Sequence, residues 1–189
     1  MSLQYNPCEV MTMKKSILRW ELGGIAFIVV LGSVLHFVFE WSGYAIPVAP
    51  IAAVNESIWE HLKLGFWPAL VYAALEYSRF RKSANNFPSA KTLGICLIPI
   101  TIVVLYYTYT AILGHGLLEV DIAIFVVAVI VGQVVSYKLL TASPLQERLN
   151  RFAPIALVIL GILFVLFTFY PPHLPLFRDS VTGGYGIVK

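Results

Sequence analysis

Five apolar stretches of about twenty residues or more follow one another along the chain, separated by short polar segments. They cover residues 17–41, 57–79, 91–114, 120–140 and 151–170. About 20 helical residues cross the roughly 30 Å hydrocarbon core of a bilayer. Inside lipid, helices satisfy every backbone hydrogen bond, and no alternating barrel pattern is present. We therefore predict an all-α integral membrane bundle of about five transmembrane helices.

The second stretch, 57–79, is the weakest of the five because charged residues occupy both of its ends. Glu60, His61 and Lys63 lie in its first turns, and Glu76 and Arg79 lie in its last turns. We expect it to span only if these charges reach the headgroups. Glu60 and Lys63 stand three apart and predict an ion pair, or Lys63 extends outward to the headgroups. Glu76 is expected to pair with Arg79 at the inner boundary.

Composition supports the membrane assignment and excludes a second, soluble domain. Apolar and aromatic residues make up 59% of the 189 residues, and charged residues make up only 12%, against roughly 25% in soluble domains. The mean hydropathy is +0.81. The range 1–189 is thus predicted to form one transmembrane domain. The first apolar stretch exceeds a usual signal-peptide core, which favours an uncleaved helix.

Lysine and arginine are distributed unequally between the two sides of the predicted bundle. Ten lie on the side of the N-terminus and three on the other side. Short cytoplasmic loops collect basic residues, so the N-terminus is predicted inside and the tail 171–189 outside, in a cytoplasmic (inner) membrane. Because the basic residues follow this rule, they do not indicate a nucleic-acid partner. The expected partner is the lipid bilayer.

All four histidines and most carboxylates fall on the predicted outer side. His36 lies 16 residues beyond Trp20, or about 24 Å along a helix, which places it near the outer edge of the hydrocarbon. The same side carries His61, His115, His173, Glu40, Glu56, Glu60, Glu119, Asp121 and Asp179.

This histidine and carboxylate set predicts a site for zinc or another divalent metal. Imidazole and carboxylate groups are the ligands that such ions prefer, and three protein ligands leave a position for water. The predicted ligands are His36, Glu56, Glu60, His61, His115 and His173 in some subset. Glu56 or Glu60 is predicted to be either a ligand or the general base, and Arg178 or Lys63 is the predicted contact for a substrate anion.

Several of these residues also have purely structural interpretations. Ser57 and Glu60 match the capping box that starts many helices. His115, between two glycines, is compatible with a solvated turn, and His61 with a half-exposed interfacial position. His36 is the most diagnostic residue, because polar groups within the membrane usually face the bundle interior.

The tail after Tyr170 is rich in proline and glycine but too apolar for a disordered end. We expect it to fold back as a cover over the outer mouth; the alternative is a tail that lies on the bilayer surface. Arg178 and Asp179 within it form either an internal pair or an anion clamp.

The segment Asn55-Glu56-Ser57-Ile58-Trp59-Glu60-His61-Leu62-Lys63, with the Pro-Pro-His tail that ends in Gly-Tyr-Gly, resembles an uncharacterised family of small prokaryotic multi-spanning membrane proteins. The resemblance runs over most of the chain. It implies a prokaryotic membrane location and no particular chemistry.

Three classes of function are compatible with these features. The first is a membrane-embedded, metal-dependent hydrolase that acts on a lipid or lipid-linked substrate at the outer leaflet. The second is a transporter or channel for a metal ion or small solute, which the expected lack of charge near the midplane disfavours. The third is a noncatalytic membrane subunit or scaffold.

Overall fold

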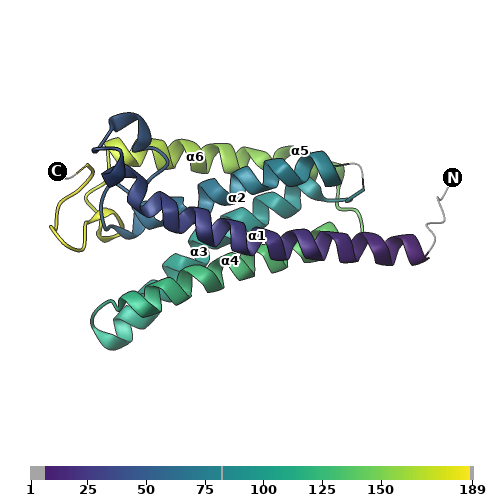
Figure 1. Ribbon diagram of the computed structural model, residues 1–189, viewed down its shortest axis with the longest axis horizontal. Helices are drawn as coiled ribbons and strands as arrows, with labels where there is room; N and C mark the ends of the chain where they lie inside the picture. Colours follow the sequence, from purple (N-terminus) through teal and green to yellow (C-terminus); the bar gives the residue numbers. More distant parts are fainter. Residues whose placement is uncertain (1–6, 82, 188–189) are drawn as a thin grey trace.

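The computed structural model describes residues 7–81 and 83–187, and its long elements are all helices (Figure 1). Lys82 and Lys189, which the charge count included, lie outside the described residues. The elements in chain order are α1 (Pro7–Trp41), the 3-10 turn η1 (Ile46–Val48), α2 (Ile58–Phe80), α3 (Phe87–Leu113), α4 (Leu118–Leu140), α5 (Glu147–Phe152), α6 (Pro154–Phe169) and the 3-10 turn η2 (Pro175–Phe177). The predicted all-α class is confirmed.

Four segments are long and apolar enough to cross a membrane. They are Glu9–Trp41, Phe87–Leu113, Leu118–Leu140 and Glu147–Phe169, the last of which joins α5 to α6. The chain is therefore a multi-pass membrane protein. The fifth predicted span corresponds to α2, which has 23 residues and differs from the other four in its charged positions.

Three charged residues of α2, Glu60, Lys63 and Glu76, point into the bundle, whereas Arg79 is exposed. Lys63 is fully buried, so the alternative in which it extends to the headgroups is wrong. Its predicted ion pair with Glu60 is confirmed, with 2.5 Å between Lys63 Nζ and Glu60 Oε2. The predicted pair of Glu76 with Arg79 is also wrong, because Glu76 instead contacts Lys91 of α3. Inward pairing explains how a charged helix packs at the centre of an apolar bundle.

Aromatic side chains pack α6 on α2, and glycines bring α3 and α4 together. Phe164 of α6 lies between Trp59 and Phe66 of α2, with ring centroids 4.8 and 5.0 Å away. Gly94 of α3 and Gly132 of α4 face each other so closely that a Cβ on Gly94 would lie 2.8 Å from the Gly132 carbonyl oxygen. Small residues at such positions allow membrane helices to approach closely.

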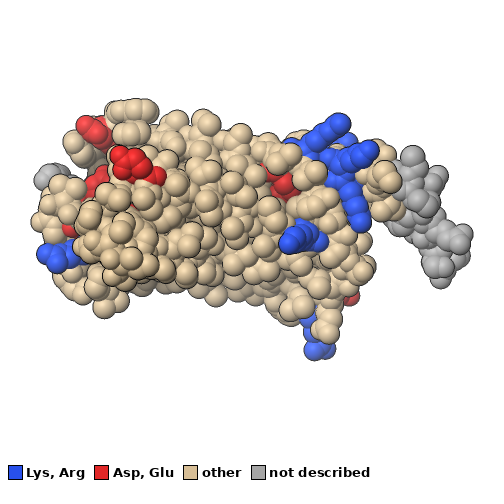
Figure 2. All heavy atoms as spheres, turned by 90° about the horizontal axis from the view of Figure 1, so that it is seen from below, with Lys and Arg blue, Asp and Glu red and all other residues tan. Residues whose placement is uncertain are grey.

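The two ends of the bundle differ in charge. Helix α1 begins at one end, and the tail 171–187 lies at the opposite end (Figure 1). On the face shown in Figure 2, lysine and arginine lie mostly where α1 begins and acidic residues mostly at the tail end, with an uncharged belt between them. At the tail end, Phe177 of η2 packs on Trp59 with ring centroids 4.8 Å apart. The tail is thus part of the folded structure.

Candidate metal centre

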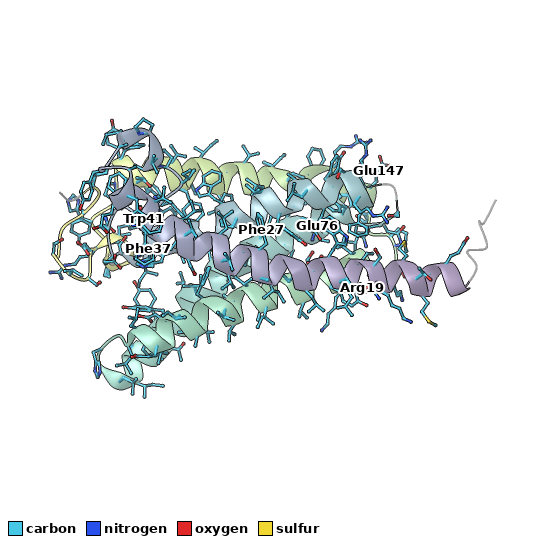
Figure 3. All side chains as sticks on the ribbon, viewed as in Figure 1. Arg19, Phe27, Phe37, Trp41, Glu76 and Glu147 are labelled. Carbon is cyan, nitrogen blue, oxygen red and sulfur yellow. The ribbon has the colours of Figure 1, made fainter. Side chains whose placement is uncertain are left out.

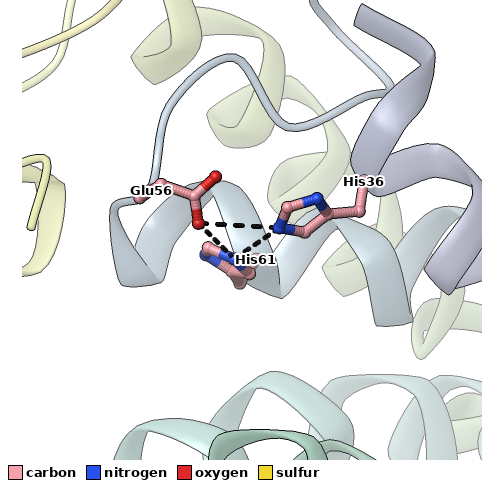
Figure 4. A group of neighbouring side chains, drawn as sticks. All are labelled: His36, Glu56 and His61. Carbon is pink, nitrogen blue, oxygen red and sulfur yellow. Dashed lines mark hydrogen bonds and ion pairs between the residues drawn. The ribbon is translucent and has the colours of Figure 1, made fainter. Parts of the chain in front are cut away.

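Three side chains from three chain segments converge at the tail end of the bundle. His36 comes from the last turns of α1, Glu56 from the loop just before α2, and His61 from the first turn of α2. Figure 4 shows the three side chains pointing toward one another. Among the described residues, this is the one group of histidine, cysteine and carboxylate side chains with spacing suited to a metal ion.

The distances within this group match those expected around zinc. The two Nε2 atoms of His36 and His61 are 3.2 Å apart. Glu56 Oε2 lies 3.5 Å from His36 Nε2 and 3.3 Å from His61 Nε2. Ligand atoms about 2.05 Å from a tetrahedral zinc ion are separated by about 3.3 Å. The three atoms therefore have the spacing of one face of a zinc tetrahedron.

The backbone of α2 fixes the orientation of the His61 ring. His61 Nδ1 lies 2.8 Å from the Ser57 carbonyl oxygen, and a carbonyl can only accept a hydrogen bond. Nδ1 must therefore carry a proton, so a neutral His61 directs the lone pair of Nε2 at His36 and Glu56. Metal-binding histidines commonly donate their second ring nitrogen in this way.

His36 has less support from its surroundings. Its Nδ1 is buried and has no hydrogen-bond partner among the described residues. The ring lies beside Phe37, with centroids 4.8 Å apart. The Nδ1 atom of His36 therefore lacks the hydrogen bond that orients the ring of His61.

The site is open on one side, and its carboxylate is ionised at neutral pH. The side chains of His36, His61 and Glu56 are 28%, 34% and 45% exposed, which leaves access for water or substrate. Hydrogen bonds from His36 and His61 hold the pKa of Glu56 well below its usual range and outweigh the effect of burial. Glu56 is therefore ionised and able to bind a cation.

The C-terminal tail holds the loop that carries Glu56. The Glu56 backbone N–H donates to Asp179 Oδ1 at 3.3 Å, and Ser180 Oγ donates to the Glu56 carbonyl at 3.1 Å. Asn55 Nδ2 donates to the Gly186 carbonyl at 2.6 Å. These bonds join positions more than 120 residues apart in sequence. The tail therefore positions a predicted metal ligand.

Asp179 has a role in this support that differs from the predicted internal pair or anion clamp with Arg178. It is buried, and Thr182 Oγ1 donates to its Oδ2 at 2.5 Å. Burial raises the pKa of Asp179, but hydrogen bonds from Thr182, Val181 and Glu56 outweigh it and hold the pKa below its usual value. The predicted pair of Asp179 with Arg178 is wrong, because Arg178 Nε instead donates to the Gly183 carbonyl.

Glu60 directly precedes His61 in the sequence but belongs to a different, buried cluster. Its carboxylate accepts from the Val54 backbone N–H at 3.1 Å and from Thr168 Oγ1 at 3.2 Å, in addition to the Lys63 ion pair. Ser57 Oγ accepts from the Glu60 N–H at 3.4 Å. Half of the predicted capping box is present, because the Glu60 side chain bonds to Val54 and not back to Ser57.

The remaining predicted site residues lie apart from the group. His115 is exposed in the turn between α3 and α4, with Nδ1 3.1 Å from the Leu113 carbonyl oxygen. His173 is exposed in the tail and packs on Tyr185, with ring centroids 4.6 Å apart. Arg178 is also exposed. The structure thus brings together His36, Glu56 and His61 and leaves the other predicted ligands outside.

Comparison with known proteins identifies the family but attaches no activity. A model described as a family of unknown function, DUF6512, matches residues 10–187. No curated protein and no solved structure matches the chain. The resemblance to an uncharacterised family is confirmed, while its prokaryotic distribution stays a prediction. With nearly its whole length matched, the chain belongs to DUF6512, a family of unknown function.

Proposed function

We propose that this membrane protein binds zinc or a similar divalent ion through His36, Glu56 and His61 and uses it for hydrolysis. The observation that carries the proposal is the triangle of ligand atoms with sides of 3.2, 3.3 and 3.5 Å. Three protein ligands with one open position are typical of catalytic zinc sites, whereas structural sites are closed by a fourth ligand.

The electrostatics of the triangle call for a positive charge at its centre. In a neutral His61 the Ser57 carbonyl holds the ring proton on Nδ1, which leaves the Nε2 lone pair facing the Glu56 carboxylate at 3.3 Å. A proton on Nε2 turns this contact into a hydrogen bond. Two acceptors at this distance repel unless a proton or a metal ion lies between them. A metal ion also satisfies His36 Nε2, which is 3.2 Å from His61 Nε2, and so it accounts for all three contacts.

A divalent ion held in this way lowers the pKa of a bound water to about 7, which supplies a nucleophile at neutral pH. The role of the chain is then to hold the three ligands and leave the open side accessible. Glu60, the other predicted general base, is engaged by Lys63 and Thr168. Glu56 therefore acts as a ligand, and Glu60 stabilises the loop and helix around it.

The position of the site favours a lipid or lipid-linked substrate. His36 lies just before the end of α1 at Trp41, and the nearby Phe37 and Trp41 are 46% and 69% exposed. Exposed aromatic side chains at a helix end are typical of the membrane interface. The segregation of charge between the two ends (Figure 2) supports the orientation with the N-terminus inside and the metal centre outside.

Metal analysis of the purified protein tests the metal centre. We expect about one zinc per chain for the wild type, and its loss in His36→Ala, His61→Ala and Glu56→Gln. His115→Ala is the matched control, because His115 is exposed and apart from the group. Unchanged stoichiometry in both His36→Ala and His61→Ala would overturn the proposal.

The hydrolase assignment requires a separate measurement. Zinc-dependent cleavage of a lipid phosphoester or acyl ester in mixed micelles is expected for the wild type and His115→Ala, and not for Glu56→Gln. Zinc binding without cleavage of either class would refute hydrolysis while leaving the metal centre intact.

A carrier for the same ion is a second candidate, favoured by one observation. The bundle interior contains a buried group of charged residues, Glu21, Glu76 and Lys91, and intramembrane charges often mark ion pathways. Zinc uptake into proteoliposomes that contain the protein, absent from vesicles with His36→Ala, is the result that would replace the hydrolase with the carrier.

A further inference from the structure

Two carboxylates share one lysine in the interior of the bundle, toward its basic end. Lys91 Nζ of α3 lies 2.7 Å from Glu21 Oε1 of α1 and also contacts Glu76 Oε2 of α2. The three side chains are at most 5% exposed. Figure 3 shows Glu76 inside the bundle, while Arg19 and Glu147 lie at its periphery. We call these three residues the interior triad.

The surroundings of the interior triad are polar but contribute no further positive charge. From α4, Ser136 Oγ donates to Glu21 Oε1 at 2.8 Å, and Gln133 Nε2 donates to the Glu21 carbonyl at 3.3 Å. The titratable group of α2 that faces both carboxylates is the Tyr72 phenol, whose hydroxyl donates to the Trp20 carbonyl at 2.6 Å. Lys91 is thus the one cation that the described residues place against Glu21 and Glu76.

The interior triad has an uncompensated negative charge when all its members are ionised. At the other end of the bundle, one lysine faces one carboxylate in the Glu60–Lys63 pair, which is balanced. An isolated buried charge costs several kcal/mol or more, so such groups are paired or become neutral. The second carboxylate of the interior triad therefore needs either a proton or another cation.

Buried carboxylate oxygens without hydrogen-bond donors mark the place where a proton or another cation is needed. Glu21 Oε2 and Glu76 Oε1 are both buried, and neither has a hydrogen-bond donor among the described residues. Buried acceptors without donors are rare in folded proteins. A proton on either carboxyl removes the excess charge and supplies a donor, and it needs no additional volume in this packed interior.

We infer that the interior triad is a proton-binding site, in which Glu21 and Glu76 together hold one exchangeable proton while Lys91 stays charged between them. The two carboxylates interact through the same ammonium group, so the proton belongs to the pair and not to one residue. Intramembrane carboxyl groups of this kind serve as proton relays in membrane proteins. The inference is independent of the metal centre.

Infrared spectroscopy of the purified full-length protein at pH 7 tests this inference. We expect the carbonyl stretch of a protonated carboxyl group, shifted on exchange into deuterium oxide. This band should be lost in both Glu21→Gln and Glu76→Gln and retained in Glu147→Gln. Glu147 is the matched control because it is exposed and forms a surface ion pair with Arg151. A wild-type spectrum without such a band, or a band that persists in both variants, would overturn the inference.

A second measurement needs no variant. If the extra charge is a proton, the thermal midpoint of the wild type at fixed pH and ionic strength should be the same in sodium, potassium and choline chloride. A midpoint that rises in sodium or potassium relative to choline would show an alkali cation at the interior triad and would contradict the proton site.

Discussion

Two polar clusters share the first turn of α2 and differ in almost every physical respect. Glu56 and His61 face His36 at an open edge, where their side chains are 45% and 34% exposed. Glu60 and Lys63 face the interior, where their side chains are 3% and 0% exposed. Residues three or four apart share a helix face, whereas a shift of one or two positions turns a side chain elsewhere. One turn of helix therefore carries both a candidate site and the buried pair that supports it.

The difference in solvation tells which cluster stabilises the fold and which is available for binding. Lys63 donates to Glu60, to the Ala49 carbonyl and to Thr168, so its charge and donors are used within the protein. Glu56 is ionised and faces two imidazoles that converge on a common point. The buried cluster is complete without a ligand, whereas the open cluster has three converging ligand atoms that a bound cation satisfies.

Removal of one member of the buried pair should have the largest effect on stability. Lys63→Met leaves the Glu60 carboxylate buried without its cation, which typically costs about 3–5 kcal/mol. The free energy of unfolding in detergent, measured by chemical denaturation, checks this expectation. Arg151→Ala is the control, because the Arg151–Glu147 pair is 68% and 86% exposed and such surface pairs contribute about 0–1 kcal/mol. Equal losses in the two variants would contradict the distinction between the clusters.

Acidification should weaken metal binding at the open cluster. Two imidazoles must lose any proton they carry before a metal binds, so up to two protons compete with the ion. As the pH falls through the range in which the two imidazoles take up protons, the affinity should fall by up to roughly a hundredfold per pH unit. Isothermal titration with zinc between about pH 5.5 and about pH 8 gives this slope. A zinc affinity independent of pH would exclude imidazole ligands.

Asp179 provides a smaller, indirect way to perturb the open cluster. Asp179→Ala removes the acceptor for the Glu56 backbone N–H and for Thr182, so the ligand loop becomes less well positioned. Loss of groups that orient a metal ligand commonly lowers affinity about 10–100-fold. Arg178→Ala is the matched neighbour, since its side chain is exposed and bonds within the tail. The same zinc affinity in both variants would show that the tail does not position Glu56.

Much of the architecture follows from hydropathy, because spans of about 20 apolar residues are strong signals. Four predicted spans fall on helical segments that are long and apolar enough to cross a membrane, although the first of these segments begins at Glu9, well before the predicted start at residue 17. The charged second stretch was harder to interpret. Its charges were expected at the headgroups, but the rotation of α2 directs Lys63 toward Thr168, which is 105 residues away in sequence.

The sequence predicted how far along each helix the candidate-site residues lie, but not toward which neighbouring helix their side chains point. Helical rise places His36 near one end of α1, and spacing places Glu56 and His61 near the start of α2, so their proximity is a consequence of topology. Which side chains share a face between helices depends on packing that periodicity alone does not define. For this reason His115 was grouped with His36 although it lies in an exposed turn, and the Glu76 contact with Lys91 was missed.

X-ray absorption at the zinc edge of the purified, zinc-loaded protein tests the central claim most directly. We predict a first shell of nitrogen and oxygen at about 2.0–2.2 Å, with outer-shell scattering from two imidazole rings, contributed by His36 and His61. His115→Ala should give the same spectrum, whereas His61→Ala should lose the imidazole scattering together with the bound zinc. A spectrum without imidazole scattering, or one unchanged in His61→Ala, would contradict the proposed metal centre.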